Sequence, residues 1–316
     1  MDEPAEISVV IPCYNSFKSL MELNERLIRT LEELKVRYEI IYVNDCSKDQ
    51  TIHVLRSLSE HHQHITVIDL MFNVGQFRAL LCGITHSSGA LVVTMDDDLQ
   101  HPPEEITKLY SYMMSNTHLD VVFGEYSSKK HSFFRNVGSF MMGKMNELTI
   151  KKPKNVTFSS FRCLRRSLVD TLIEYNTLFP QLGPLIVKST SSERMANVRI
   201  HHEPRKYGQS NYSLFLLFKT SLNHLINFSS APLKYISIFG VMVSLISIVS
   251  TFFCLFYKYH TGTSIGWTWG IILTLHFYSG LLLLSIGIIG EYLIRIMYEV
   301  KGFPKYKIRE VYKNNK

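Results

Sequence analysis

Cysteine is scarce in this chain, and no two cysteines have CxxC spacing. Five are scattered along 316 residues, at Cys13, Cys46, Cys82, Cys163 and Cys254. This pattern argues against a disulfide framework or a structural zinc site, and it indicates a catalytic part in a reducing, cytosolic compartment. The opening residues MDEPAEIS are acidic and hold no apolar run, so we expect no cleavable signal peptide.

Both common glycine-rich phosphate-binding signatures are missing as well. The first predicted strand, Ile7 to Ile11, runs into PCYN and not into a GxGxxG turn, which argues against a dinucleotide-dependent oxidoreductase. The chain also has no GxxxxGKS/T loop, so it is not predicted to wrap a triphosphate in a P-loop. An anionic ligand must therefore be held by other groups.

Acidic residues are outnumbered, and the formal net charge is +7. Such a charge favours anionic partners, for example a phosphate-bearing substrate or an anionic lipid surface. The basic residues gather beside apolar segments and do not form a stripe interleaved with aromatics, so we expect no nucleic-acid partner. Hydrophobic residues make up 46% of the chain, which is high for a purely soluble protein and predicts that part of it lies in a membrane.

Two long uncharged runs predict a transmembrane helical hairpin over residues 235–296. Tyr235 to Tyr257 holds 23 residues without a charge, which as a helix would span about 34 Å. A second such run extends from Trp267 to Ile289. Both exceed the usual length of a buried core helix, which is the alternative explanation. Lysine and arginine flank the pair, whereas the short connection holds only Lys258, so the positive-inside rule places both termini in the cytoplasm.

The rest of the chain divides around this hairpin. Residues 1–210 are predicted to be a cytoplasmic catalytic domain. Residues 211–234 have an interrupted apolar face, which predicts an interfacial helix at the lipid headgroups or, alternatively, a helix that closes the domain. Residues 297–316 are predicted to be a basic cytoplasmic tail. Gly287 and Gly290 would permit close helix packing, either within the hairpin or between protomers of a homo-oligomer.

Short apolar strands alternate with amphipathic helices in the first part of the chain. Two helical stretches, Phe17 to Lys35 and Asp49 to His62, carry leucines at three- and four-residue spacing. The predicted strands are ISVVI (7–11), YEIIYV (38–43), ITVIDL (65–70), LVVTM (91–95) and DVVFG (120–124). This series of βαβ units predicts an α/β fold with a mostly parallel sheet.

Polar motifs follow three of these strands. PCYNS follows the first strand, NDCSKD the second and DDDLQHPP the fourth. Ligands of open parallel sheets bind beyond the carboxyl ends of the strands. We therefore expect the three motifs to converge on one cleft.

Three consecutive aspartates, Asp96 to Asp98, raise the question of what balances their charge, because like charges so close repel one another. Asp96 and Asp98 point the same way at a strand end. Carboxylate oxygens suit Mg²⁺ or Mn²⁺, and such ions bridge protein carboxylates to substrate phosphates. We therefore predict a metal-diphosphate as the partner. An acidic turn before Pro102 and Pro103 would account for one aspartate but not for three.

At this point the motifs carry a family resemblance that covers nearly the whole chain. SVVIPCYN, YEIIYVNDCSKDQT, NVGQFRALLCGITHSSGALVVTMDDDLQHPPEEI and HHEPRKYGQSNYS resemble the successive signatures of glycosyltransferase family 2. The hairpin and the segment GEYLIRIMYEVKGFPKY are similar to its polyprenyl-phosphate branch, which includes undecaprenyl-phosphate and dolichyl-phosphate glycosyltransferases.

The resemblance implies a GT-A (Rossmann-like) nucleotide-sugar-binding domain followed by the transmembrane hairpin. It implies transfer of a sugar from a UDP- or GDP-sugar to a polyprenyl phosphate, with inversion and with Mg²⁺ or Mn²⁺ as cofactor. It also implies an integral protein of the bacterial inner membrane that serves cell-envelope glycan or lipopolysaccharide modification. The sugar, the nucleotide and the lipid length are not fixed by the sequence.

The resemblance further implies site residues. The donor would be held by Pro12, Tyr14, Asn15, Asn44 and Asp45. The metal would be held by Asp96, Asp98 and Gln100. Arg135 would lie near the acceptor phosphate, and Arg205 and Ser210 belong to the segment that closes over the diphosphate in the family. Asp98, Arg135 and Arg205 are the residues that would carry catalysis.

Several positions depart from the family pattern. Asn44 stands where the family often has aspartate, and Asp97 where a small residue is usual. Tyr126 occupies a place where relatives often have arginine, for which Lys129 or Lys130 could compensate. Asn211 replaces a usual lysine.

The departure at Ser160 bears on the mechanism. Many inverting relatives have the aspartate of a GDFR-like motif there, whereas this chain reads SSFRC. A sugar hydroxyl acceptor would need such a base at neutral pH, but a phosphate monoester has a second pKa near 6 and is already a charged nucleophile. Ser160 therefore favours a lipid-phosphate acceptor. Transfer to a glycan or lipid hydroxyl, and a catalytically silent scaffold that binds nucleotide-sugar, remain the alternatives.

Overall fold

The computed structural model describes residues 5–126, 155–175, 181–201, 267–301 and 305–314, together with residues 153 and 203 and isolated positions between 238 and 262. The chain divides into two compact units. One comprises Met1–Ser213 with Phe303–Lys316, and the other comprises Leu214–Gly302. Each unit is described by itself.

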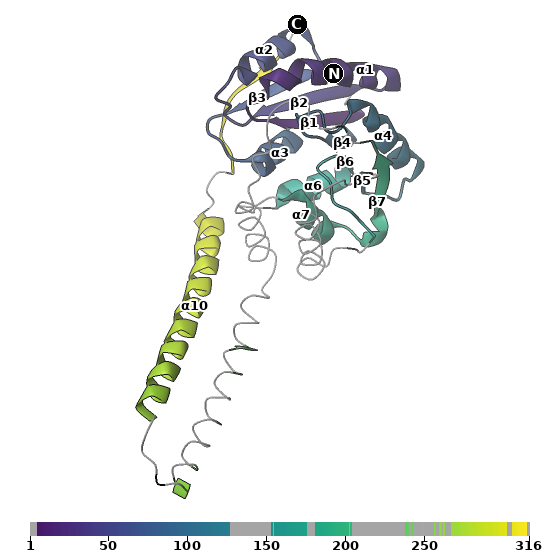
Figure 1. The fold of residues 1–316 in the computed structure, drawn as a ribbon. Helices are drawn as coiled ribbons and strands as arrows, with labels where there is room; N and C mark the ends of the chain where they lie inside the picture. The colour runs from purple at the N-terminus through teal and green to yellow at the C-terminus, as the bar shows by residue number, and fades with distance from the viewer. Residues whose placement is uncertain are drawn as a thin grey trace. The chain divides into compact units, whose positions relative to one another are not determined.

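The described strands of the first unit form one eight-stranded sheet in the order β7-β5-β6-β4-β1-β2-β3-β8 (Figure 1). The strands are β1 (Ile7–Cys13), β2 (Tyr38–Asn44), β3 (Ile65–Leu70), β4 (Leu91–Thr94), β5 (Val121–Tyr126), β6 (Arg162–Arg165), β7 (Met195–Ile200) and β8 (Ile308–Lys313). β4, β1, β2 and β3 pair in parallel, as the βαβ pattern predicts. β6 and β8 are antiparallel to their neighbours.

Helices of the first unit flank this sheet (Figure 1). They are α1 (Phe17–Leu34), α2 (Thr51–His61), α3 (Gln76–Thr85), α4 (Ile106–Ser115), α6 (Arg166–Glu174) and α7 (Leu182–Ser189), with short 3₁₀ turns η1 (Pro103–Glu105) and η2 (Ser192–Arg194). The leucine spacing explains the packing of α1, because Leu20, Leu23, Leu27 and Leu31 repeat on one face of the helix and are buried. Gly83 lets α3 approach β1, since a Cβ there would lie 2.3 Å from Val10 Cγ1.

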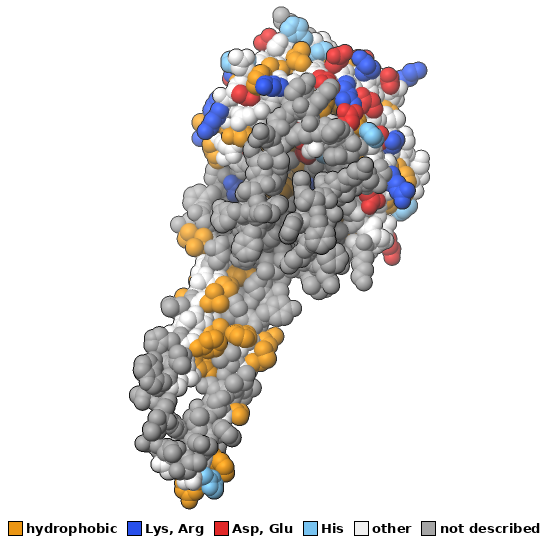
Figure 2. Space-filling model, viewed as in Figure 1, with side chains coloured by type: hydrophobic (Ala, Val, Ile, Leu, Met, Phe, Trp, Pro, Cys, Tyr) orange, Lys and Arg blue, Asp and Glu red, His pale blue; other side chains and the backbone are white. Residues whose placement is uncertain are grey.

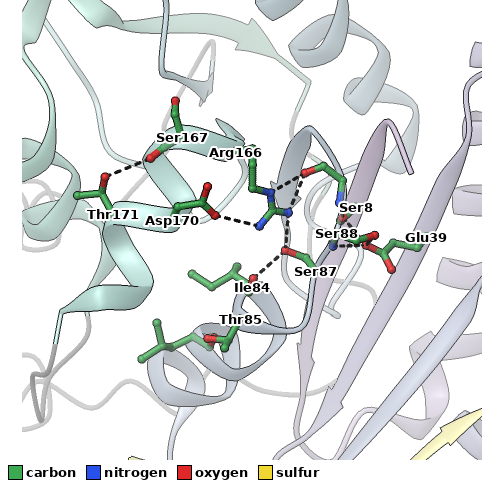
Figure 3. Close-up of polar contacts among 12 residues, drawn as sticks. Ser8, Glu39, Ile84, Thr85, Ser87, Ser88, Arg166, Ser167, Asp170 and Thr171 are labelled. Atoms are coloured by element: carbon green, nitrogen blue, oxygen red, sulfur yellow. Dashed lines mark hydrogen bonds and ion pairs between the residues drawn. The ribbon is translucent and has the colours of Figure 1, made fainter. Parts of the chain in front are cut away.

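A polar network holds the amino ends of the strands, the edge opposite to the three motifs (Figure 3). The Glu39 carboxylate accepts hydrogen bonds from Ser8 Oγ and from Ser88 N, both at 2.6 Å. The Arg166 guanidinium donates two hydrogen bonds to the carbonyl oxygen of Gly89, at 2.9 and 2.7 Å. These contacts fix α6 and the turn before β4 to the sheet, so we assign this edge a structural role.

α10 (Trp267–Lys301) is the long helix of the second unit. Within it, Phe277–Ile294 is apolar and long enough to cross a membrane by length and composition. It is the one such helix among the described residues. The expected first span, residues 235–257, lies outside the described residues except for a few isolated positions, as does the expected interfacial segment, residues 211–234.

Residues 297–316, which were expected as a basic tail, include two regular elements in the structure. α10 continues to Lys301, and Ile308–Lys313 forms β8, which pairs with β3 at the edge of the sheet. The sequence IREVYK reads as a polar segment because Arg309, Glu310 and Lys313 are charged, and its partner strand lies far away in the chain. A strand this polar can form only because it occupies an edge position, with much of its surface in solvent.

Candidate functional site

The loops that follow β1, β2 and β4 leave the same edge of the sheet. β1 lies between β2 and β4 and pairs with both in parallel, with Cys13 opposite Asn44 and Val10 opposite Thr94. The three loops, residues 14–16, 45–48 and 96–101, are called the strand-end loops below. Their arrangement confirms that the predicted motifs share one edge.

Asp96 is held by side chains from two other parts of the fold. Its Oδ1 accepts a hydrogen bond from Gln76 Nε2 at 2.7 Å, and its Oδ2 accepts one from Ser160 Oγ at 2.7 Å. Ser160 is itself fixed, because its carbonyl oxygen accepts a hydrogen bond from Thr94 Oγ1. The contact places Ser160 directly beside the aspartates. Sequence reasoning did not identify Gln76, whose only signal is its place at the start of the helix after NVG.

A buried arginine supplies positive charge behind the aspartates. Arg162 is only 5% exposed, and its Nε donates to Thr94 Oγ1. Burial lowers the pKa of Arg162 to about 10, and the charge of Asp96 opposes that shift. The guanidinium therefore remains protonated at neutral pH. Part of the balance expected for the three aspartates thus comes from the protein, through an arginine that the sequence analysis quoted within SSFRC but did not assign.

His101, at the end of the same loop, packs close to Asp96. It is buried and stacks on Phe161, with ring centroids 5.2 Å apart. Its Nδ1 lies 3.9 Å from Asp96 Oδ2. Burial lowers the pKa of His101, against the opposing influence of the aspartates. The imidazole is therefore neutral at pH 7 and contributes shape and packing more than charge.

The middle aspartate faces a different way. Asp97 Oδ2 accepts hydrogen bonds from Tyr14 N at 3.3 Å and from the Ser16 hydroxyl. Burial raises the pKa of Asp97 to about 7, and repulsion from Asp96 and Asp98 adds to the shift. Asp97 thus braces the loop after β1, a role that the sequence did not reveal.

Asp96, Asp98 and Gln100 are the residues predicted to hold a metal. Asp98 Oδ1 accepts a hydrogen bond from the backbone N of Gln100, which keeps the loop tight. No cluster of three or more His, Cys, Asp or Glu side chains suited to a metal occurs in the part of the chain that the structure describes. Mg²⁺ and Mn²⁺ do not require one, because such ions are commonly bound through one or two carboxylates together with substrate phosphates. The donor set therefore fits such an ion.

The loops after β1 and β2 are cross-linked by Asn15. Its backbone N donates to Ser47 Oγ at 3.0 Å, and its Oδ1 accepts from the backbone N of Lys48 at 2.9 Å. Asn15 has φ of 56°, a conformation that asparagine tolerates better than most residues. Tyr14 is exposed beside it. Pro12, in contrast, is buried within β1.

Asn44 and Asp45 are both buried and organise the loop after β2. Asn44 Nδ2 donates to Asp69 Oδ1 at 2.7 Å. The Asp45 carboxylate accepts hydrogen bonds from the backbone N of Val74 at 2.7 Å and of Gly75 at 2.9 Å. Burial raises the pKa of Asp45, and these two hydrogen bonds oppose the shift. Asp45 thereby orders the turn that presents Gln76 to Asp96, and sequence reasoning missed Asp69.

Other predicted positions lie outside the described residues. They are Arg135, Arg205, Ser210, Asn211, Lys129, Lys130 and the side chain of Tyr126. Glu203 is described, and its backbone N donates to the carbonyl oxygen of Gln100 at 3.1 Å. The Glu203 carboxylate lies 3.1 Å from Arg26. The chain two residues before Arg205 is therefore anchored against the aspartate loop.

Known proteins of the glycosyltransferase class resemble this chain in sequence. The family profile described as Glycosyl transferase family 2 matches residues 8–173. Undecaprenyl-phosphate 4-deoxy-4-formamido-L-arabinose transferase of Sodalis glossinidius (strain morsitans) is 30% identical over 318 aligned residues, which cover 98% of this chain and 95% of that protein.

Solved structures agree on the fold. Glucosyl-3-phosphoglycerate synthase of Mycobacterium tuberculosis, solved in complex with Mn²⁺, UDP and glucosyl-3-phosphoglycerate, matches with a TM-score of 0.50 at 18% identity over 70% of this chain and 78% of that one. Another structure of the same enzyme matches with a TM-score of 0.51 at 16% identity over the same shares. At this identity the likeness supports a GT-A-like fold. With the profile, the relative and the fold in agreement, the chain belongs to glycosyltransferase family 2.

Proposed function

We propose that the protein transfers a sugar from a UDP- or GDP-sugar to a polyprenyl phosphate at the cytoplasmic face of a membrane. The sequence relation to an undecaprenyl-phosphate sugar transferase extends over nearly the whole chain and supports this substrate class. Its product would serve modification of the cell envelope, and the membrane would be the bacterial inner membrane.

The contact between Ser160 and Asp96 is the observation that favours a lipid phosphate over a hydroxyl group as the acceptor. Ser160 stands where many inverting relatives have an acid, and its hydroxyl is engaged with a carboxylate at 2.7 Å. A serine hydroxyl bound in this way cannot act as a general base at neutral pH. An acceptor that needs no deprotonation, such as a phosphate monoester, therefore suits this site.

The reaction is one displacement at the anomeric carbon. An oxygen of the acceptor phosphate forms a bond to that carbon, the bond to the diphosphate oxygen breaks, and the nucleoside diphosphate leaves with the electron pair. Asp96, Asp98 and Gln100 would hold Mg²⁺ or Mn²⁺, which would neutralise charge on the leaving diphosphate. Gln76 and Ser160 keep the Asp96 carboxylate oriented for that task.

The remaining predicted residues bind and position the substrates. Tyr14, Asn15, Asn44 and Asp45 would shape the nucleoside pocket. Arg135 and Arg205, with Ser210, would hold the two phosphate groups close together, so that catalysis comes from positioning and electrostatics.

The order of the two units supports a membrane hairpin. Residues on both sides of Leu214–Gly302 belong to the same compact unit, so they must lie on one side of a membrane. If α10 crosses that membrane, the segment before it must cross back. Residues 235–257 supply a run of the required length. Two crossings would leave the catalytic unit whole on one side of the membrane. The positive-inside rule supports the cytoplasm as that side.

Donor turnover by the purified full-length chain in detergent tests this function. UDP- and GDP-sugars are supplied with Mg²⁺ or Mn²⁺, with and without undecaprenyl phosphate. We expect a sugar-lipid only when the lipid phosphate is present, and we expect Asp98→Ala to abolish it. Glu25→Ala is the matched control, because Glu25 is an exposed acid on α1 that pairs only locally with Arg29.

Two results would contradict the proposal. Transfer to a glycan or lipid hydroxyl without any lipid phosphate would move the acceptor to the second substrate class. Binding of nucleotide and metal without turnover of any donor would instead indicate a nucleotide-sugar-binding scaffold.

A further inference from the structure

The edge strand β8 has a β-bulge at Arg309. Along the β3–β8 ladder Asp69 lies opposite Glu310 and Leu70 lies opposite Ile308, so Arg309 is an extra residue between two paired positions. In a regular strand Glu310 would share a face with Asp69, and Arg309 would point to the other face. A bulge re-aims the side chain of the extra residue. Here Arg309 Nη1 reaches Asp69 Oδ2 at 3.2 Å.

Asp69 needs this cation. Its side chain is only 2% exposed, and the ladder sets a second carboxylate, Glu310, directly opposite. Like charges in opposing positions destabilise a pair of strands, and a buried carboxylate without a partner costs more. Glu310 is engaged elsewhere, because its Oε2 accepts from Tyr312 Oη at 2.5 Å.

The other oxygen of Asp69 fixes Asn44. Asn44 Nδ2 donates to Asp69 Oδ1, which leaves Asn44 Oδ1 to accept from the backbone N of Ser47 at 3.3 Å. Ser47 Oγ in turn accepts from the backbone N of Asn15. A continuous set of hydrogen bonds therefore runs from β8 to the strand-end loops. It also explains why asparagine suits position 44, since an aspartate there would face Asp69 as a second buried anion.

We propose that Arg309 is a positioning residue of the donor site: by balancing buried Asp69 it fixes the Asn44 amide and the strand-end loops that would bind the nucleoside. This inference deepens the proposed function and rests on it for the identity of the ligand. The strand that follows the membrane segment thereby sets the shape of the nucleotide pocket.

Arg56 offers a matched control, because it is another arginine that bonds β8. Arg56 of α2 donates to Tyr312 Oη and lies 3.8 Å from Glu310 Oε2. It holds β8 to α2, and no contact joins it to Asp69. Arg56→Gln therefore reports the effect of loosening β8, whereas Arg309→Gln also removes the charge that balances Asp69.

Hydrogen exchange of the full-length protein without nucleotide is the first measurement. We expect Arg309→Gln to speed exchange at residues 44–48 by about tenfold, the effect of weakening one hydrogen-bonded contact. Arg309→Lys should restore most of the protection, and so should the double variant Asp69→Asn with Arg309→Gln, which leaves no unpaired charge. Equal effects of Arg56→Gln and Arg309→Gln, or no effect of either on residues 44–48, would overturn the inference.

Steady-state kinetics is the second measurement. We expect Arg309→Gln to raise the KM for the nucleotide-sugar about tenfold and to leave the KM for undecaprenyl phosphate unchanged. An equal change in both KM values would overturn the role in donor positioning. If the wild-type chain turns over no donor at all, the proposed function fails, and the exchange comparison still decides whether Arg309 positions the loops.

Discussion

At the scale of single residues, Asp97 has a structural role that differs from the role proposed for Asp96 and Asp98. Its neighbours Asp96 and Asp98 are proposed to hold a metal, whereas Asp97 fixes the loop after β1 through Tyr14 and Ser16. We predict that Asp97→Ala lowers the free energy of unfolding by about 1 kcal/mol, because it removes the carboxylate that accepts from the Ser16 hydroxyl and shares Tyr14 N with Ser16 Oγ. Asp97→Asn should keep the acceptor and relieve the repulsion from Asp96 and Asp98. Thermal midpoints of both variants test this, and a lower midpoint for Asp97→Asn than for Asp97→Ala would refute it.

Cysteine reactivity offers a second test at this scale. Burial raises the pKa of the Cys82 and Cys163 thiols to about 12 and that of Cys13 well above its usual value. Because the thiolate is the reactive form, iodoacetamide at pH 8 should leave these three unmodified. Cys46 is half-buried beside Asp45 in a strand-end loop, so it should react first among the described cysteines.

Nucleotide should protect Cys46 if the donor binds where we propose. Mass spectrometry of the alkylated peptides, with and without UDP or GDP, measures the protection. Equal labelling of Cys46 in both conditions would place the nucleotide elsewhere, and rapid labelling of Cys13 would mean that the core opens.

The sequence predicted Asp96, Asp98, Asn15, Asn44 and Asp45 as neighbours because motif position after a parallel strand decides which edge a residue occupies. It did not predict the partners. Gln76, Asp69 and Arg162 meet these residues only after distant elements pack together, and the local sequence does not show which residues they will contact. Pro12 lies within β1 and is buried there, so its predicted contact with the donor stays a prediction.

At the scale of elements, Arg26 ties α1 to η1 and to the segment after β7. This α1 residue bonds Glu104 of η1 at 2.8 Å and Glu203, after β7, at 3.1 Å. The hydrogen bond from Arg26 lowers the pKa of Glu104, more than burial raises it. A carboxylate with a depressed pKa adds stability above its unfolded pKa of about 4.3, and that stability is lost as the pH falls through the folded pKa.

We therefore predict that acid loosens this contact. Between about pH 5 and pH 3 the thermal midpoint of the wild-type chain should fall more steeply than that of Glu104→Gln, which has no charge to lose. The difference should be small, because Glu104 is 54% exposed and water screens the pair. Glu25→Gln serves as a control, and parallel curves for Glu104→Gln and wild type would disprove the prediction.

Elements with strong local periodicity were predictable, and the others were not. The apolar runs of β1 to β5 and the leucine pattern of α1 identify themselves in short windows of sequence. β6 is the four-residue segment RCLR, and its two arginines are more typical of a loop than of a buried strand. β8 is mostly polar. Both become strands because neighbouring strands offer unpaired backbone groups, a tertiary effect that overrides local preference.

At the scale of the whole molecule, connectivity leads to a topology test. We predict that a cysteine replacing Lys258 reacts with a membrane-impermeant maleimide applied outside intact spheroplasts, in a Cys46→Ser background. A cysteine replacing Lys313, in β8, should react only after the membrane is permeabilised. Reaction of both before permeabilisation, or of neither, would contradict a hairpin with the catalytic unit on the cytoplasmic side.

Because β8 pairs with β3, the sheet is completed late in the synthesis of the chain. β3 leaves the ribosome early, but its partner strand is made only after residues 214–302 have been translated. Until then the outer edge of β3 has no strand beside it, and such an edge can pair with another chain. The catalytic sheet therefore cannot be completed until the apolar helix α10 has been synthesised.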